Sequence, residues 1–430
     1  MKEKIDLLIR NIGQLCTVPA HDSGPQRGSR LGDLGIVEHA ALALHEGVIV
    51  AIGPDSDLNE TYSRGMTLDA GGMLVTPGLV DPHTHLIWAG DRAGEFEQRI
   101  AGATYQQIMA AGGGINRTVQ QTRAASLDVL IEQAKARLNT MLAHGTTTVE
   151  CKTGYGLNTK TEVAMLNAVA LLDMEHPMDL VPTFLGAHAV PPEFAGNTEG
   201  YVQLIIEEML PAVAAWWDEN WPGTLFSDVF CEVGAFDLDQ TRRILEAAKT
   251  YGMALKIHVD EFESLGGAKL AADLNAVSAD HIVVTPEADI KALAQSDTIA
   301  VALPPTPFGL AHRDYTPARQ FLEAGAALAI ATDCNPGTAW NENMQLVMAL
   351  AARYLRLTPA QALAAATINA AYAISQGDRV GSLEVGKQGD VVIWGVPSYP
   401  HLSYRFGSNL AQTVIKRGQV VYSARWGGTF

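Results

Sequence analysis

Cysteine is scarce in this sequence, which has four in 430 residues and no CxxC pair. The four are Cys16, Cys151, Cys231 and Cys334. So few thiols exclude a disulfide-rich scaffold and favour a reducing compartment. Long apolar runs are also absent, since none approaches the roughly 18 residues that a membrane span requires. The start, MKEKIDLLIRN, places Glu3 and Asp6 where a secretion signal would carry a cation and then a long apolar stretch. We therefore expect a cytoplasmic protein.

Basic side chains are in short supply as well, because Lys and Arg number 30 against 47 Asp and Glu. The formal net charge of -17 argues against binding nucleic acid or an anionic membrane through bulk charge. An anionic ligand would have to be held by a few locally placed cations. What the sequence does contain is typical of a folded globular protein, with 47% hydrophobic and 18% charged residues.

Short apolar runs alternate with segments of helical spacing through most of the chain, as buried parallel strands and their crossover helices do. The candidate strands are Met73–Val80, Thr146–Cys151, Leu180–Leu185, Phe226–Val233, Ala254–Val259, Ala276–Ile282, Thr298–Leu303 and Leu328–Thr332. Segments with helical spacing include Leu127–Ala143, Glu162–Met174, Gln240–Tyr251, Glu287–Ala294 and Arg319–Ala324. This alternation predicts an α/β fold, a (β/α)8 TIM-like barrel, which uses about 250 residues. A doubly wound open sheet would alternate in the same way, but the number of strands favours the barrel.

The two ends of the chain have a different pattern. Residues 1–70 contain the β-like run Ala40–Ile52, which is broken at Glu46-Gly47. Residues 380–430 contain Asp390–Trp394 and a predicted hairpin of Gln412–Ile415 with Val420–Tyr422. We expect residues 1–70 and 380–430 to pair in a smaller β-sandwich-like domain, beside a barrel of residues 71–379.

Ionisable side chains follow most of the candidate strands. The carboxyl ends of the strands offer His83, His85, Lys152, His188, Glu232, His258, His281 and Asp333. In a parallel barrel these ends meet on one face, where the active sites of this fold are built. A barrel with a purely structural role has no need of such side chains there.

The strongest local pattern is Asp81-Pro82-His83-Thr84-His85, directly after a buried strand. Residues two apart on a strand point to the same side, about 6.5 Å apart, so both imidazoles can reach one ion at ~2.0–2.1 Å. In isolation this motif is as well explained by two histidines in a surface turn. Its position after a strand, with His258 and Asp333 on later strands, favours a metal site.

Later strand ends supply the other candidates. His258 is followed by Glu261, a carboxylate placed to act as a general acid or base, although a histidine among apolar neighbours is often a core residue. Asp333 ends a strand, where Asp also commonly caps a turn, and the segment up to Thr338 has turn residues that could hold a ligand. His281 is placed to orient a catalytic water or polarise a carbonyl, or to pack at a strand end.

Three histidines and one carboxylate are a sufficient ligand set for a hydrolytic Zn²⁺ or iron ion with one position open for water. The set proposed here is His83, His85, His258 and Asp333. Such an ion lowers the pKa of its water from ~15.7 to about 7.

The order and spacing of these residues resemble the amidohydrolase superfamily, and nearly the whole chain is similar to the imidazolonepropionase family. The similarity is carried by DPHTHLIWAGDRAGEFE at 81–97, GATYQQIMAAGGGI at 102–115, CKTGYGL at 151–157, FLGAHAVPP at 184–192, HVDEF at 258–262 and ATDCNPGT at 331–338. The metal-ligand pattern is shared by a broad superfamily, whereas Arg92, KTGYGL and FLGAHAVP together are specific to the narrower family.

The resemblance implies a role for each matching residue. Metal ligands would be His83, His85, His258 and Asp333, and catalytic residues would be Glu261, His281 and Asp333. Arg92 and Tyr155, helped by Tyr105, would hold the carboxylate of the substrate. The imidazolone ring would be contacted by His188, Glu261, Asn335, Gly337 and Thr338. Without the resemblance, a salt bridge from Arg92 to Asp91, Glu95 or Glu97 would be the simpler interpretation.

The implied reaction is the hydrolysis of 4-imidazolone-5-propanoate, a small anion, to N-formimidoyl-L-glutamate in histidine degradation. Many members of the superfamily bridge two metals with a modified lysine after the fourth strand. Here Phe230-Cys231-Glu232 offers no lysine, so we expect one Zn²⁺ or iron ion per chain. The resemblance also suggests a homodimer, and neither nucleic acid nor a membrane is expected as a partner.

Two other functions are compatible with parts of this pattern. A purine or pyrimidine ring deaminase would use the same metal site, but its pocket is neutral, so Arg92 and Tyr155 argue against it. A non-catalytic barrel scaffold would have lost its ligand histidines, and here the four proposed ligands are all present.

Overall fold

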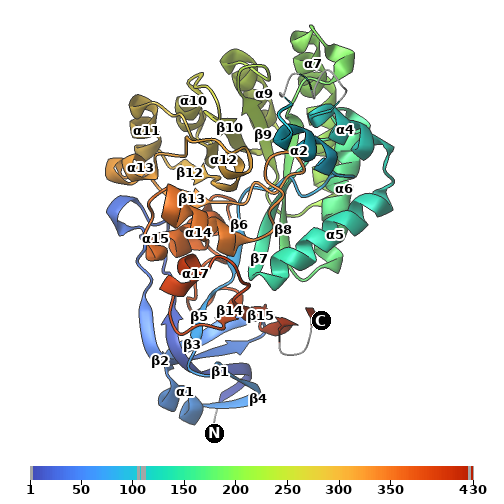
Figure 1. The fold of residues 1–430 in the computed structure, drawn as a ribbon. Helices are drawn as coiled ribbons and strands as arrows, with labels where there is room; N and C mark the ends of the chain where they lie inside the picture. The colour runs from blue at the N-terminus through green and yellow to red at the C-terminus, as the bar shows by residue number, and fades with distance from the viewer. Residues whose placement is uncertain (1–2, 104–106, 108–112, 425–427, 430) are drawn as a thin grey trace.

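The computed structural model describes residues 3–103, 107, 113–424 and 428–429. These residues form two bodies (Figure 1). The larger is a barrel surrounded by helices, and the smaller is a β-sheet to which both ends of the chain contribute.

Eight parallel strands form the barrel, in the order in which they occur along the chain. They are β6 (Leu79–Asp81), β7 (Thr146–Lys152), β8 (Asp179–Ala187), β9 (Phe226–Cys231), β10 (Ala254–Val259), β11 (Ser278–His281), β12 (Ile299–Ala302) and β13 (Leu328–Ile330). The ring closes just beyond its first and last strands, where Thr84 bridges Cys334 and the His85 amide donates to the Cys334 carbonyl at 3.0 Å. The predicted barrel is confirmed.

Helices cover the outside of the barrel (Figure 1). The helices between barrel strands, and those that follow β13, are α2 (Ala93–Ile100), α4 (Ile115–Ala124), α5 (Leu127–Ala143), α6 (Thr159–Glu175), α7 (Thr198–Leu204), α8 (Leu210–Asn220), α9 (Leu238–Thr250), α10 (Gly267–Leu274), α11 (Glu287–Ala294), α12 (Pro305–Gly309), α13 (Ala318–Ala324), α14 (Met344–Tyr354), α15 (Pro359–Ala365), α16 (Ile368–Tyr372) and α17 (Pro400–Tyr404). The periodicity predicted α5 and α11 residue for residue. Asp237 and Gln240 form a capping box that fixes the start of α9. Among the described residues, none of the helices combines the length and the apolar character needed to cross a bilayer.

The predicted strand Met73–Val80 is wrong as a single strand. It is divided at Pro77-Gly78 into β5 (Leu74–Pro77), which pairs with β1 and β14 in the smaller sheet, and β6, which begins the barrel. Proline cannot donate to a strand ladder. A Cβ on Gly78 would lie 2.2 Å from the Thr147 hydroxyl oxygen, so only glycine lets the chain pass this close to β7.

Both ends of the chain contribute to the smaller sheet. Its strands are β1 (Glu3–Cys16), β2 (Ile36–His45), β3 (Val48–Pro54), β4 (Tyr62–Asp69), β5, β14 (Val391–Trp394), β15 (Ala411–Lys416), β16 (Gln419–Ser423) and β17 (Gly428–Thr429), with α1 (Asp55–Thr61) packed against β2 and β3. The predicted hairpin is present as β15 and β16, and β2 and β3 form a second one; both turns, Arg417-Gly418 and Glu46-Gly47, have positive φ at both residues. The pairing of the two ends is therefore confirmed, while the exact domain boundaries stay a prediction.

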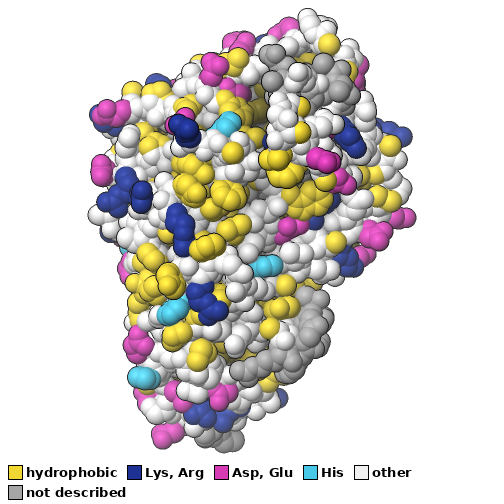
Figure 2. Space-filling view, viewed as in Figure 1, with side chains coloured by type: hydrophobic (Ala, Val, Ile, Leu, Met, Phe, Trp, Pro, Cys, Tyr) yellow, Lys and Arg dark blue, Asp and Glu magenta, His cyan; other side chains and the backbone are white. Residues whose placement is uncertain are grey.

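Acidic and basic side chains are interspersed over the face shown in Figure 2, with hydrophobic side chains between them. On that face, the described Lys and Arg side chains lie singly or in small groups. Such a distribution agrees with the excess of acidic residues in the sequence.

His176, which follows α6, makes the stability of the fold sensitive to acid. Its Nδ1 accepts from the Met178 amide at 3.3 Å and its Nε2 pairs with Asn139 Oδ1 at 3.2 Å, an arrangement that needs a neutral ring. Burial first, and then the charge of Lys135, lowers the pKa of His176 to about 4. The unfolded chain therefore takes up a proton first as the pH falls, and stability present above about pH 6.5 is lost towards pH 4.

We expect the wild-type protein to lose ~2 kcal/mol more unfolding free energy than a His176→Gln variant between pH 7 and pH 4.5. Denaturant titrations at both values measure this difference, and groups common to both proteins cancel. The exposed His39→Gln is the control and should follow the wild type. Equal slopes for wild type and His176→Gln would contradict the assignment.

Candidate active site

The predicted site residues converge at the carboxyl ends of the barrel strands. His83 and His85 follow β6, His258 lies near the end of β10, and Asp333 follows β13. All four are at most 3% exposed. The strand ends meet here because every strand of a parallel barrel runs in the same direction.

The coordinating atoms of the proposed ligands face one point. His83 Nε2 and His85 Nε2 lie 3.6 and 3.5 Å from Asp333 Oδ1. His258 Nε2 lies 3.5 Å from His85 Nε2. In a tetrahedral zinc site with bonds of ~2.0–2.1 Å, neighbouring ligand atoms are about 3.3–3.4 Å apart. The three separations are close to this spacing. The ligand atoms of His83, His85 and Asp333 all lie within 4.8 Å of one another, and so do those of His83, His258 and His281.

One further observation fits a bound cation. His83 Nε2 is buried and has no hydrogen-bond partner among the described residues. Burial first, and then nearby positive charges, keeps the pKa of His83 and of His85 well below the ordinary histidine value. Both rings are therefore neutral at pH 7, which is the form that binds a metal.

Two buried carboxylates orient the proposed ligands, and sequence reasoning missed both. Asp280 Oδ2 lies 2.7 Å from His83 Nδ1, and Asp228 Oδ2 lies 3.0 Å from His258 Nδ1. The hydrogen bond to Asp280 fixes the tautomer of His83 and leaves its Nε2 lone pair for a metal, and Asp228 is close enough to favour the same tautomer in His258. The signal available in the sequence was a charged residue inside an otherwise apolar strand.

A hydrogen bond also orients the carboxylate of Asp333. Thr306 donates to its Oδ2 at 2.5 Å, which leaves Oδ1 towards the histidines. Burial raises the pKa of Asp333 to about 6. His281 and Asp333 have φ of +78° and +52°, and such conformations cost about 1–3 kcal/mol for residues other than glycine. Strain of this kind is common where a side chain must be aimed at a site.

Glu261 and His281 border a small cavity beside this point. The cavity has a volume of about 210 Å³ and is also lined by Phe262, Thr306 and Pro307. Glu261 Oε2 lies 3.7 Å from His281 Nε2. Burial first, and then the charges of Asp333 and Glu232, raises the pKa of Glu261 well above the ordinary value. Glu261 is therefore placed to exchange a proton with a molecule in the cavity.

Two of the predicted substrate-binding residues lie next to the histidines. The rings of His85 and His188 stack with centroids 4.7 Å apart, and Tyr155 lies 5.2 Å from His188. His188 Nδ1 donates to the Gly154 carbonyl at 2.9 Å, so its Nε2 is left for another partner. Burial first, and then the charge of His258, lowers the pKa of His188 to about 3.

The segment after Asp333 is shaped by Asn335. Its Oδ1 accepts from the amides of Gly337 and Thr338, both at 2.8 Å, and its Nδ2 donates to the Asp333 carbonyl at 2.7 Å. These hydrogen bonds use much of the donor and acceptor capacity of the Asn335 side-chain amide. In the structure Asn335 therefore orders the segment that carries Gly337 and Thr338.

Arg92 lies against this segment. Its Nε donates to Glu95 Oε2 at 2.8 Å, so the salt bridge considered from the sequence is present. A Cβ on Gly337 would lie 2.4 Å from Arg92 Nη1, which shows how closely the guanidinium approaches. Arg99, which sequence reasoning missed, donates to the Gly337 carbonyl at 3.3 Å. Tyr105 lies outside the described residues.

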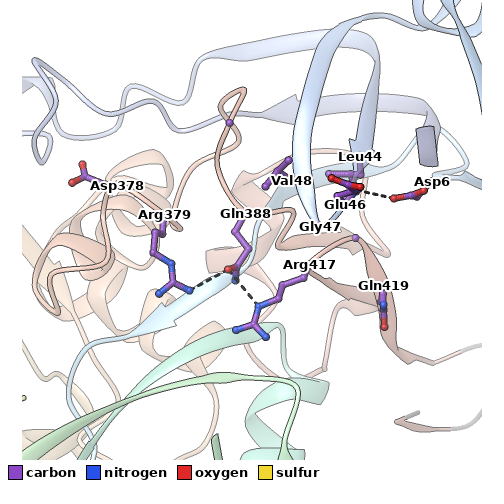
Figure 3. A pocket seen from close by; sticks show the side chains of 12 residues that line it. Asp6, Leu44, Glu46, Gly47, Val48, Asp378, Arg379, Gln388, Arg417 and Gln419 are labelled. Carbon is purple, nitrogen blue, oxygen red and sulfur yellow. Dashed lines mark hydrogen bonds between the residues drawn. The ribbon is translucent and has the colours of Figure 1, made fainter. Parts of the chain in front are cut away.

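A larger cavity of about 570 Å³ lies away from these residues, at the smaller sheet (Figure 3). Its two arginines, Arg379 and Arg417, both donate to Gln388, and Asp6 accepts from the Glu46 amide. It contains none of the predicted site residues. The smaller cavity beside the histidines is the better candidate for catalysis because the reactive groups line it.

Comparison with known proteins shows the family to which the chain belongs. The sequence matches the family model described as "Amidohydrolase family" over residues 74–421. An imidazolonepropionase from Herpetosiphon aurantiacus is 53% identical over 97% of this chain and 97% of its own length. Another, from Chloroflexus aggregans, is 49% identical over 97% of this chain and 99% of its own.

Solved structures share the fold at lower identity. An adenosine deaminase from Xanthomonas campestris with bound zinc has a TM-score of 0.71 at 21% identity, covering 99% of this chain and 94% of that one. A 5-methylcytosine deaminase from Klebsiella pneumoniae has a TM-score of 0.71 at 17% identity, covering 97% of both chains. At such identities the likeness extends to the fold alone.

Proposed function

Because the chain belongs to the amidohydrolase family, and within it to the imidazolonepropionases, we propose that it hydrolyses 4-imidazolone-5-propanoate to N-formimidoyl-L-glutamate with one bound Zn²⁺ or iron ion. The reaction opens a cyclic amide in the degradation of histidine. A new bond forms between water oxygen and the ring carbonyl carbon, the ring C–N bond breaks, and a proton ends on the departing nitrogen.

The observation that carries the metal assignment is the spacing of four buried coordinating atoms. Three separations of 3.5–3.6 Å, from Asp333 to His83 and to His85 and from His85 to His258, support a single site formed by these four residues. When bound, the ion polarises the ring carbonyl and lowers the pKa of a water to about 7.

The proton transfers are assigned to Glu261 and its neighbours. Glu261 would accept a proton from the attacking water and deliver it to the ring nitrogen, because it lines the cavity and has a raised pKa. His281 would orient the water, and Asp333 would assist as a hydrogen-bond acceptor.

Substrate binding is assigned to Glu261, which lines the small cavity, and to residues near the proposed metal ligands. Arg92 and Tyr155, with Tyr105 as a helper, would bind the propionate carboxylate, since a guanidinium pairs with a carboxylate through two parallel hydrogen bonds. His188 and Glu261 would contact the imidazolone ring. Asn335, Gly337 and Thr338 complete the proposed ring-binding set.

The decisive experiment combines metal analysis of the purified protein with an ultraviolet assay for loss of imidazolonepropionate. We expect about one zinc or iron ion per chain together with turnover. One ion per chain without turnover, and with ammonia released from a purine or pyrimidine, would instead identify a ring deaminase. A protein without metal and without turnover would be a barrel scaffold.

The remaining expectations stay predictions. They are a cytoplasmic location, a small anionic substrate, neither nucleic acid nor a membrane as a partner, and a homodimer. Gel filtration with light scattering measures the last of these directly.

A further inference from the structure

Five charged side chains are buried together inside the barrel, beneath the proposed metal site. They are Glu150, Lys152, Asp228, Lys256 and Asp280, each 0–1% exposed. All lie on β7, β9, β10 or β11, on the faces that point into the barrel. Burying so many charges is costly unless each has a close partner, so such a cluster calls for a physical reason.

Lys152 is the centre of this cluster. Its Nζ lies 2.7 Å from Glu150 Oε1, 2.8 Å from Asp228 Oδ2 and 3.7 Å from Asp280 Oδ2. Burial alone would lower the pKa of Lys152, but the three carboxylates raise it above the ordinary value. The ammonium is therefore a permanent positive charge that faces three negative ones.

Two of these carboxylates lie between Lys152 and a proposed metal ligand. Asp228 Oδ2, the oxygen that meets Lys152, is also the atom 3.0 Å from His258 Nδ1. Asp280 Oδ2, the oxygen nearest to Lys152, lies 2.7 Å from His83 Nδ1. In both cases a single oxygen lies between the ammonium and a histidine.

The third carboxylate, Glu150, holds the backbone between His83 and His85. Glu150 Oε2 accepts from the Thr84 amide at 3.0 Å, and Thr84 Oγ1 donates to the Glu150 carbonyl at 2.5 Å. The Lys152 amide also donates to the Thr84 carbonyl at 2.9 Å. Because Thr84 separates His83 from His85, these bonds set the position of both rings.

We propose that Lys152 is a positioning residue for the metal site, which through Asp228, Asp280 and Glu150 holds all three ligand histidines in the geometry that binds the ion. The inference rests on the metal site of the proposed function. Without the ammonium, three carboxylates crowded in the barrel interior would repel one another and move away from the histidines they orient.

The second buried lysine offers a matched control. Lys256 Nζ donates to Ser278 Oγ at 2.7 Å and to the Ala373 carbonyl at 3.1 Å, and it lies 3.7 Å from Asp280 Oδ2. It therefore shares the burial of Lys152 and its 3.7 Å distance to Asp280, although burial lowers the pKa of Lys256. It differs in having no bond to Asp228 or Glu150 among those of the described residues.

The test compares Lys152→Met with Lys256→Met in the full-length protein, because methionine keeps the length of the side chain and removes its charge. Zn²⁺ affinity is measured by competition with a chelator. We expect Lys152→Met to weaken Zn²⁺ binding by about 10–100-fold, the usual effect of losing a group that orients metal ligands. Lys256→Met should change the affinity less than about threefold. The absorption of bound Co²⁺ should change only in Lys152→Met, since it reports ligand geometry.

Three outcomes would overturn the proposal: unchanged Zn²⁺ affinity in a folded Lys152→Met, an equal loss in both variants, or an unchanged Co²⁺ spectrum. If Lys152→Met does not fold, the double variant Lys152→Met/Glu150→Gln removes one charge of each sign and keeps the cluster's net charge. Weak Zn²⁺ binding in the double variant supports the proposal, and wild-type binding overturns it. Failure of the wild type itself to bind Zn²⁺ or iron would count against the proposed function instead.

Discussion

Replacing Glu261 by Gln should lower kcat by about 10²–10⁴-fold, the contribution usually made by a general acid–base group. The amide keeps the shape and polarity of the side chain but cannot carry a proton between water and the leaving nitrogen. Glu261 borders the small cavity and lies 3.7 Å from His281. It is not among the proposed ligands, so the metal content should stay at the wild-type level. Steady-state kinetics and metal analysis on the same preparation measure both quantities.

The neighbouring Glu263→Gln serves as the matched control. Glu263 is exposed, so its kinetics should equal those of the wild type. A Glu261→Gln protein that retains both metal and turnover would remove Glu261 from the mechanism. Loss of turnover together with loss of metal would move its role from proton transfer to metal binding.

Replacing Arg92 by Gln should lower kcat/KM for imidazolonepropionate by about 10–150-fold. This range corresponds to the ~1.5–3 kcal/mol that hydrogen bonds to charged groups contribute. The loss should be mainly in KM, because the carboxylate is remote from the reacting bond and is bound equally in the ground and transition states. An analogue whose carboxylate is replaced by an amide should lose little. Kinetics with both substrates measure the difference.

The salt bridge between Arg92 and Glu95 calls for a second variant. Glu95→Gln breaks the same pair but leaves the guanidinium in place. If Arg92 binds the substrate, Glu95→Gln should retain most of the wild-type kcat/KM. An equal loss in both variants would mean that Arg92 acts only as the partner of Glu95. Arg117→Gln, at an exposed position of α4, controls for the loss of a surface charge.

Most of the fold could be predicted because hydrophobic periodicity is a local property. The helices α5 and α11 and the eight-strand alternation were all present in the order of apolar and polar residues. The division at Pro77-Gly78 was missed because an apolar run of eight residues has the pattern of one strand. Its cause, the close approach of Gly78 to Thr147, involves residues about seventy positions apart.

The candidate site could likewise be predicted only in part from the sequence. The sequence predicted the proposed metal ligands His83, His85, His258 and Asp333. They lie at or just after strand ends, where a polar side chain interrupts an apolar pattern. The supporting residues Asp228 and Asp280 lie inside predicted strands, and their role depends on which strand is the neighbour. Arg99 offered no pattern, since an arginine at the end of an amphipathic helix is ordinary.

The chain of residues alone therefore determined the fold class, the family and which side chains carry reactive groups, because these follow from local pattern and residue type. Only the tertiary structure decided that His83 and His85 approach Asp333, and His258 approaches His85, with ligand atoms 3.5–3.6 Å apart. It also decided that Lys152 lies among three carboxylates. The physical reason is that electrostatic and coordination energies depend on distances between strands, and closure of the barrel sets those distances.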